Sequence, residues 1–386
     1  MKSFVANKIQ NLPYSGIRKF FDVASEMTDV VSLGVGEPDF ITPWHIREEA
    51  IFSLEQRHTM YTSNAGMPEL RNEISRYMSS QFGLQYNPGN QVLVTVGASE
   101  GIDVVLRAII NPGDEVLVVE PCFVSYIPCV LMAGGIPVSV PTNAANGFRV
   151  TADDIQAKIT PKTKAIMLSY PNNPTGAILE REDLEAIAAL LRKHDIVVIS
   201  DEIYAELTYG DIPHTSIASL PDMYEKTIVL NGFSKAFAMT GWRLGYACGP
   251  AELIAAMTKI HQYIIMCAPT TAQYGGIEAL RKGRPSILAM RKEYDARRHL
   301  MINELRQMEI DCFEARGAFY LFPSISRFGL TSDEFCDRLL REQRLAVVPG
   351  AAFGDSGEGH IRCSYAYSID SIKEALSRLH KFIKAL

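Results

Sequence analysis

A lysine lies where one of the most apolar runs of the chain ends. Residues 227–233 (TIVLNGF) are followed by Ser234 and Lys235, with Arg243 a short distance further along. If the run is a buried strand, Lys235 lies at the rim of a sheet and not on a solvated helix. The small and hydroxyl-bearing residues beside it leave room for a flat, phosphorylated ligand. This is the setting that a lysine needs in order to hold pyridoxal phosphate as a Schiff base.

Three other side chains are candidates for holding such a ring. Asp201 follows the apolar residues 196–199 (IVVI), and a carboxylate there can cap a helix, form an ion pair or keep a pyridine nitrogen protonated so that the ring accepts electrons. Tyr204 follows shortly and is either a core residue or a donor to the ring oxygen. Asn173, within residues 172–176 (NNPTG), is either part of an ordinary Pro–Gly turn or an amide donor to the same oxygen.

A phosphate group has its own candidate partners. Gly97, Ala98 and Ser99 begin an expected helix, so backbone N–H groups, a hydroxyl and the helix dipole point to one place. Arg243 adds a bidentate cation. Phe123, after the strand expected at 115–119, is either a core residue or a ring that stacks on the ligand.

Arg362 lies on the short apolar run 360–364 (HIRCS), where an arginine needs an anionic partner. That partner is either a structural carboxylate of the protein or the carboxylate of a substrate, which the guanidinium fork matches.

The elements that position these side chains follow from the apolar pattern. We expect strands at 92–96, 115–119, 164–168, 196–199 and 227–230, with helices at 99–110 and 182–194 between them. Continuously apolar strands that alternate with helices predict a parallel sheet covered on both faces, which is an α/β architecture. Ligands bind at the carboxyl ends of such strands, where these candidates lie. From residue 285 the pattern changes to a helix at 286–308 and strands at 317–322, 346–348 and 360–364, which predicts a smaller α+β domain.

The composition excludes several classes of function. The chain has 386 residues, 47% of them hydrophobic, and a net charge of −6, so it has no electrostatic footprint for nucleic acid or an anionic membrane. Its seven cysteines lack metal-ligand spacing, and we expect no metal site. We also expect no signal peptide and no membrane span, and therefore a cytoplasmic protein with reduced thiols.

The order of these motifs resembles the class I/II aminotransferases of the fold-type I pyridoxal-phosphate family. The matching segments are 34–39 (GVGEPD), Tyr61 with 65–71 (AGMPELR), 97–99 (GAS), 173–176 (NPTG), 201–204 (DEIY), 234–235 (SK), 241–243 (GWR), 317–320 (GAFY) and Arg362. The resemblance implies a large domain with a mainly parallel seven-stranded sheet between helices, plus a smaller α+β domain. It divides the chain into 1–45 (N-terminal arm and first part of the small domain), 46–284 (large cofactor-binding domain) and 285–386 (C-terminal small domain).

The resemblance also implies a role for each matching residue. Lys235 would hold the cofactor and transfer protons, and Asp201 would pair with the ring nitrogen. The other expected cofactor contacts are Tyr204 and Asn173 at the ring oxygen, Phe123 on the ring face (where relatives often carry Tyr or Trp), and Ala98, Ser99, Ser234 and Arg243 at the phosphate. Arg362, Asn173 and the Gly36 backbone would bind the substrate α-carboxylate. Tyr61 would reach the phosphate of a neighbouring subunit, which implies a homodimer with shared sites.

The expected reaction is ping-pong transfer of an amino group from an L-amino acid to a 2-oxo acid, with 2-oxoglutarate as the favoured acceptor. Some aspartate aminotransferases carry a lysine where this chain has Ser99, which disfavours aspartate. Residues 15–20 (SGIRKF) resemble aromatic and N-acetyl-diaminopimelate aminotransferases, and Tyr14, Ile17 and Phe20 are candidates for an apolar side-chain pocket. The alternatives are an aspartate aminotransferase or a carbon–sulfur β-lyase of the same fold. A ligand-sensing transcription regulator would need a DNA-binding domain, and no basic helix precedes the fold.

Overall fold

The computed structural model describes residues 4–10, 12 and 27–386, and its centre is a seven-stranded sheet. The strands, in spatial order, are β2 (Val92–Thr95), β8 (Gly245–Cys248), β7 (Thr227–Gly232), β6 (Val197–Asp201), β5 (Thr163–Ser169), β3 (Glu115–Glu120) and β4 (Ile136–Pro141). Only β8 runs antiparallel to its neighbours. The predicted mainly parallel α/β sheet is therefore confirmed.

The apolar pattern located five of these strands but not β4 or β8. β4 (IPVSVP) is an edge strand whose side chains are mostly accessible, so its residues do not form a continuous apolar run. β8 is a four-residue strand that directly follows the loop carrying Arg243. β4 pairs only with β3, the strand before it, whereas β8 lies between β7 and the sequence-distant β2, a placement that a local pattern does not report.

Helices cover both faces of the sheet because its strands are apolar on both sides. Val116 and Val118 of β3 pack with α5 (Gly97–Ile109), α6 (Tyr126–Ala133) and α9 (Ala251–Ile264), whereas Leu117 and Val119 pack with α8 (Arg181–Leu191). The remaining helices beside this sheet are α3 (Trp44–Glu55), α4 (Pro68–Phe82), α7 (Ala152–Gln156) and α10 (Thr270–Lys282). The predicted helices at 99–110 and 182–194 thus exist, with shifted ends.

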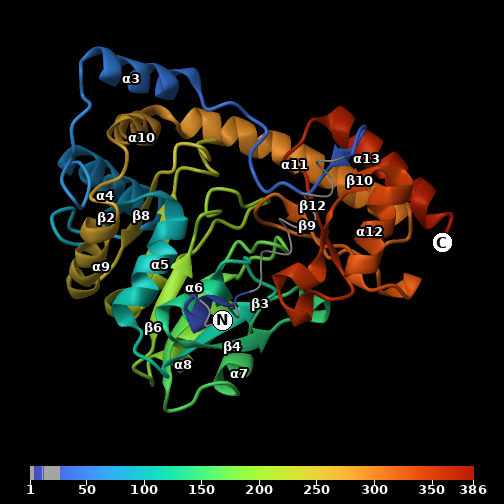
Figure 1. The fold of residues 1–386 in the computed structure, drawn as a ribbon, viewed down its shortest axis with the longest axis horizontal. Coiled ribbons are helices and arrows are strands. Elements are labelled where there is room, and N and C mark those ends of the chain that lie inside the picture. Colours follow the sequence, from blue (N-terminus) through green and yellow to red (C-terminus); the bar gives the residue numbers. More distant parts are fainter. Residues whose placement is uncertain (1–3, 11, 13–26) are drawn as a thin grey trace.

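The C-terminal part has its own small sheet and core. It contains α11 (Arg284–Gln307), β9 (Tyr320–Leu321), α12 (Ser332–Gln343), β10 (Leu345–Ala346), β11 (Val348–Pro349), β12 (Ile361–Ser364) and α13 (Ile369–Ile383). β12 lies between β11 and β9, and β10 pairs with β1 (Val31–Ser32) from the N-terminal part of the chain. In Figure 1, α11 runs from beside α10 toward α13.

Two expectations for this part need correction. The strand expected at 317–322 is reduced to β9, because Ala318 has a positive φ and the preceding residues form a turn. The strand expected at 346–348 is divided between β10 and β11, which belong to different sheets. The predicted boundary near residue 284 falls between α10 and α11, and the division into domains stays a prediction.

Short elements complete the described chain. They are α1 (Asn7–Gln10) and the 3-10 helices η1 (Ala144–Asn146), η2 (Ile217–Ser219), η3 (Tyr224–Lys226), η4 (Ser326–Phe328), η5 (Gly350–Phe353) and η6 (Asp355–Gly357). Within residues 4–10, 12 and 27–386, no helix is long and apolar enough to cross a membrane. The same residues contain no group of histidines, cysteines or acidic side chains arranged to hold a metal ion.

Candidate active site

A cavity of about 410 Å³ opens at the carboxyl ends of the parallel strands. It is lined by residues of the β2–α5, β3–α6, β5, β6 and β7 strand ends, and by N-terminal and C-terminal segments that close it from the other side. Of the predicted site residues, it brings together Gly36, Ala98, Ser99, Phe123, Asn173, Asp201, Tyr204, Ser234, Lys235, Arg243 and Arg362. This volume suits a small-molecule ligand.

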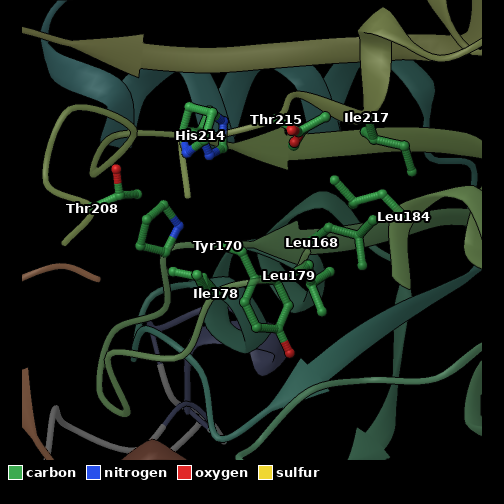
Figure 2. A pocket seen from close by; sticks show the side chains of 12 residues that line it. Leu168, Tyr170, Ile178, Leu179, Leu184, Thr208, His214, Thr215 and Ile217 are labelled. Carbon is green, nitrogen blue, oxygen red and sulfur yellow. The ribbon is translucent and has the colours of Figure 1, made fainter. Parts of the chain in front are cut away.

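A second cavity is too small for such a ligand. It measures about 20 Å³ and is lined mainly by apolar side chains, among them Leu168, Leu179 and Ile217 (Figure 2). Space of this size holds about one water molecule. The 410 Å³ cavity, which gathers the predicted residues, is therefore the candidate site, and it is the larger of the two cavities described.

Lys235 lies inside the larger cavity with its amine directed at the N-terminal segment. Its Nζ donates a hydrogen bond to the Gly36 carbonyl at 2.5 Å. Burial and then the positive charge of Arg362 lower the pKa of Lys235 to about 8, with Glu37 acting in the opposite direction. The amine is thus neutral in a large fraction of molecules in mildly alkaline solution, as a nucleophile or base requires.

Asp201 is only 4% exposed and ends β6. Its Oδ2 accepts a hydrogen bond from the Tyr126 phenol at 2.7 Å, and its Oδ1 accepts one from the Ile203 N–H at 3.2 Å. Burial raises the pKa of Asp201. No described cation forms an ion pair with it, which removes the salt-bridge interpretation for the part of the chain that the structure covers. A buried carboxylate of this kind is suited to a cationic group of a ligand.

Tyr320 and Tyr126 line this cavity, although the sequence did not single them out as site residues. The Tyr204 and Tyr320 hydroxyls lie 2.8 Å apart, and both side chains line the cavity. Burial holds the pKa of Tyr204 well above its usual value, so the phenol stays protonated. Tyr320 was noted only as part of the 317–320 motif, and Tyr126 not at all. The one available signal for Tyr126 is its place in a strand-end loop, shortly after Phe123.

An anion cradle lies at the start of α5. Gly97 begins this helix with φ of 75°, and a Cβ at that position would meet the Arg243 guanidinium. Arg243 itself has φ of 53°, a backbone conformation that is uncommon outside glycine, and its Nη1 donates to the Thr240 carbonyl at 3.0 Å. No described carboxylate forms an ion pair with Arg243. Together with Ser99 and the helix N-terminus, this guanidinium fits a phosphate group.

Arg362 is buried, with 3% of its surface exposed, and lacks an opposite charge. Its Nη1 donates to Asn173 Oδ1 at 2.9 Å and its Nη2 to the Gly34 carbonyl at 2.5 Å. The guanidinium carbon lies 4.6 Å from the Tyr320 ring centroid and 4.8 Å from that of Phe353, and Nε has no hydrogen-bond partner. No ion pair of Arg362 exists among the described residues, so the structural ion pair considered above is wrong for them.

The remaining predicted residues differ in their placement. Phe123 is half-buried at the cavity wall and packs edge to face on Tyr126, with ring centroids 5.7 Å apart. Tyr61 lies outside the cavity, on the loop between α3 and α4, and is 82% exposed. Tyr14, Ile17 and Phe20 lie outside the described residues.

The residues present fit a flat, phosphorylated pyridine aldehyde. A Cβ at residue 97 would collide with the Arg243 guanidinium, and that guanidinium has no carboxylate partner among the described residues. Asp201 is an unpaired buried carboxylate, and Lys235 has a lowered pKa. With such a group bound, the cradle would hold the phosphate, Asp201 the ring nitrogen and Lys235 the carbonyl carbon.

Comparison with known proteins agrees with this geometry. The sequence pattern of the family described as "Aminotransferase class I and II" matches residues 28–379. The chain is 54% identical to "Putative aminotransferase YugH" of Bacillus subtilis, with 99% of each chain covered. It is 46% identical to an aspartate aminotransferase of Pyrococcus abyssi, with 96% of each covered. It is 41% identical to a probable N-acetyl-LL-diaminopimelate aminotransferase of Bacillus subtilis, over 99% of this chain and 96% of that one.

A solved structure shows the same fold. The aromatic aminotransferase of Pyrococcus horikoshii superimposes with a TM-score of 0.91 at 44% identity, over 95% of this chain and 99% of that one. The relatives thus share amino-group transfer in their names but differ in the amino donor.

Proposed function

Because the chain belongs to the class I and II aminotransferases, which depend on pyridoxal phosphate, we propose an amino donor that is aromatic or N-acetyl-LL-diaminopimelate, with 2-oxoglutarate as acceptor. The observation that carries the proposal is the set of cations in the cavity. The lining residues include Lys235, Arg243 and Arg362, and no further cation. Arg243 lies in the anion cradle and Arg362 is suited to the α-carboxylate, so an aspartate side chain finds no partner among the lining residues. N-acetyl-LL-diaminopimelate and 2-oxoglutarate also carry a second carboxylate, which would need a cation from outside this lining. The lining by itself therefore favours the aromatic donor.

We assign the cofactor contacts as follows. Ala98, Ser99, Ser234 and Arg243 hold the phosphate, Phe123 covers the ring, Asp201 holds the ring nitrogen, and Tyr204 and Asn173 hold the ring oxygen. In support of the last role, Asn173 Oδ1 already accepts a hydrogen bond from Arg362, so the amide nitrogen of Asn173 is the atom that remains to donate to the ring oxygen. When bound, pyridoxal phosphate supplies an electron sink that stabilises negative charge at the substrate α-carbon.

The chain's own residues then position the substrate and move its proton. Arg362 binds the α-carboxylate through its free Nε and its fork, with Asn173 and the Gly36 backbone beside it. A Cβ at residue 36 would clash with the Tyr320 hydroxyl, so only glycine lets this segment approach so closely. Lys235 accepts the α-proton as a base and later donates it as an acid. Its lowered pKa suits both steps. Donor and acceptor use one site in turn, which gives ping-pong kinetics.

A half-reaction screen tests the proposed donor. Protein loaded with cofactor is mixed with each amino acid, and loss of its near-visible absorption band is followed. We expect fast loss with aromatic amino acids, whose side chains need no cation, and slow loss with aspartate, whose side-chain carboxylate finds none in the lining. Fast loss with N-acetyl-LL-diaminopimelate would require a cation from outside the lining for its second carboxylate. A strong preference for aspartate would contradict the donor assignment. Release of pyruvate from cystathionine would instead favour the β-lyase alternative.

We infer a homodimer from the exposed residues around Tyr61. Met60 and Tyr61, neighbours in the chain, are 81% and 82% exposed, and contiguous exposed apolar side chains mark interaction surfaces. Met60 is held near α10 by a hydrogen bond from the Thr270 hydroxyl to its carbonyl at 2.8 Å. In a homodimer Tyr61 would donate to the phosphate in the partner's cavity.

Mixed dimers test this sharing of sites. Lys235→Ala and Tyr61→Ala proteins are denatured together at equal amounts, refolded and assayed. If Tyr61 acts across the interface, one site of each mixed dimer has both residues intact, and random pairing restores up to about a quarter of wild-type activity. Activity no higher than the average of the two parent variants would contradict shared sites, as would a monomer in sedimentation at assay concentration.

We also place the protein in the cytoplasm. All seven cysteines are unpaired, and five of them are buried in the core. Unpaired thiols are typical of a reducing compartment. A disulfide in protein isolated without reductant would contradict this assignment.

A further inference from the structure

We propose that Tyr126 is a positioning residue, whose phenol fixes the Asp201 carboxylate in the orientation and charge state that hold the cofactor's ring nitrogen. This inference rests on the function proposed above. It concerns a residue that neither the sequence motifs nor the similarity to relatives assigned to the site.

The geometry gives Asp201 two donors on two different atoms. Tyr126 is the first residue of α6 and is 2% exposed, and its hydroxyl lies 2.7 Å from Asp201 Oδ2. The Ile203 N–H lies 3.2 Å from Oδ1. The backbone donor lies two residues after Asp201, so among the described residues Tyr126 alone ties the carboxylate to a separate element of the fold by a hydrogen bond. Two bonds on opposite oxygens fix the plane of the carboxylate.

The direction of the hydrogen bond follows from the environment of the phenol. Burial, and then the neighbouring Asp201, hold the pKa of Tyr126 well above its usual value. The phenol therefore keeps its proton and donates it to the carboxylate. A hydrogen bond to a charged acceptor stabilises the charged form, so Tyr126 favours ionised Asp201.

Other groups act on Asp201 in both directions. Burial and the charge of Glu202 raise its pKa, whereas Tyr126, the Ile203 N–H and Lys235 lower it. Glu202 is itself held by other partners, since it accepts hydrogen bonds from Ser200 and Ser216 and contacts His214 at 2.9 Å. Without the Tyr126 hydroxyl, the carboxylate loses its shorter hydrogen bond. Burial and the charge of Glu202, which both favour the protonated form of Asp201, remain.

Tyr126 also touches the wall that covers the ring. Its ring packs edge to face on Phe123, and both side chains line the cavity. One side chain thus contacts both the proposed stacking residue and the proposed nitrogen partner. The alternative is that Tyr126 only fills the core beside Cys122 and Val130. Replacement by phenylalanine separates the two, because it keeps the ring and removes only the hydroxyl.

The experiment uses Tyr126→Phe holoenzyme loaded with pyridoxal phosphate labelled with ¹⁵N in its ring. We expect the ring-nitrogen chemical shift to move from the protonated toward the neutral range, and kcat to fall about 10- to 100-fold, as for loss of a hydrogen bond to a charged group. The KM of the acceptor should change much less, because Arg362 is untouched.

Two comparison variants make the result specific. Tyr170→Phe removes another buried phenol, whose hydroxyl donates to the Phe148 carbonyl at 2.9 Å and which lines the small cavity of Figure 2. We expect it to lower thermal stability comparably and to leave the ¹⁵N shift unchanged. In an Asp201→Asn background, Tyr126→Phe should reduce kcat by less than about 3-fold, because the charge that it supports is gone.

An unchanged ¹⁵N shift in Tyr126→Phe, or effects of Tyr126→Phe and Asp201→Asn that multiply, would overturn the proposal. Failure of the proposed function has a different signature. In that case the wild-type protein itself would show no protonated ring nitrogen and no turnover with the proposed donors.

Discussion

Replacing Lys235 with alanine is expected to reduce transamination by at least about 10⁴-fold with every amino acid, while the protein stays folded. The amine is the one nucleophile whose pKa is lowered into the working range within the cavity, and its hydrogen bond to the Gly36 carbonyl holds it beside the substrate position. Both the covalent attachment and the proton transfer would be lost together. Single-turnover absorbance changes with the preferred donor would measure this.

Lys235 should also change how the stability of the apoprotein depends on pH. The pKa of Lys235 falls from 10.5 to about 8 on folding. Between these values the unfolded chain binds the proton and the folded chain does not, so this lysine makes wild-type stability rise as pH increases through that window. Lys235→Ala apoprotein should lack this rise in thermal unfolding scans. Lys193→Ala, at an exposed lysine beyond α8, is the control and should behave as wild type in both assays. Normal turnover in Lys235→Ala would refute the assignment.

Replacing Arg362 with alanine is expected to lower kcat/KM by about 30- to 5,000-fold, the equivalent of about 2–5 kcal/mol for leaving a desolvated carboxylate unpaired. The physical reason is that Arg362 is buried without a counter-charge among the described residues and has a free Nε. The substrate α-carboxylate would supply the missing counter-charge and accept a hydrogen bond from this Nε. Arg362→Lys should recover part of the loss, since it restores the charge but not the fork.

A pair of substrates isolates this effect. An aromatic amino acid should lose reactivity in Arg362→Ala, whereas the matching amine without a carboxylate should react equally slowly with variant and wild type. The variant should also raise the pKa of Lys235, because the charge of Arg362 is one cause of its lowering. The alkaline rise of the half-reaction rate would then move to higher pH. Equal kcat/KM for the amino acid in both proteins would show that Arg362 has no such role.

The sequence by itself determined the chemistry of the site. Lys235, Asp201 and Asn173 each follow an apolar strand, and the carboxyl ends of parallel strands share one edge, so their convergence followed from local patterns. The order of the motifs identified the family and its cofactor. These features depend on residue type and short-range spacing, which a sequence displays directly.

Tertiary structure decided what surrounds those residues. Whether Arg362 has an ion-pair partner depends on contacts between segments far apart in the chain, such as Gly34 and Asn173. Tyr126 and Tyr320 joined the site for the same reason, since each reaches it from an element remote in sequence from Asp201 or Tyr204. The lowered pKa of Lys235 likewise arises from burial and from a distant arginine. Charge state and orientation are properties of packing, and packing is not written in any local pattern of residues.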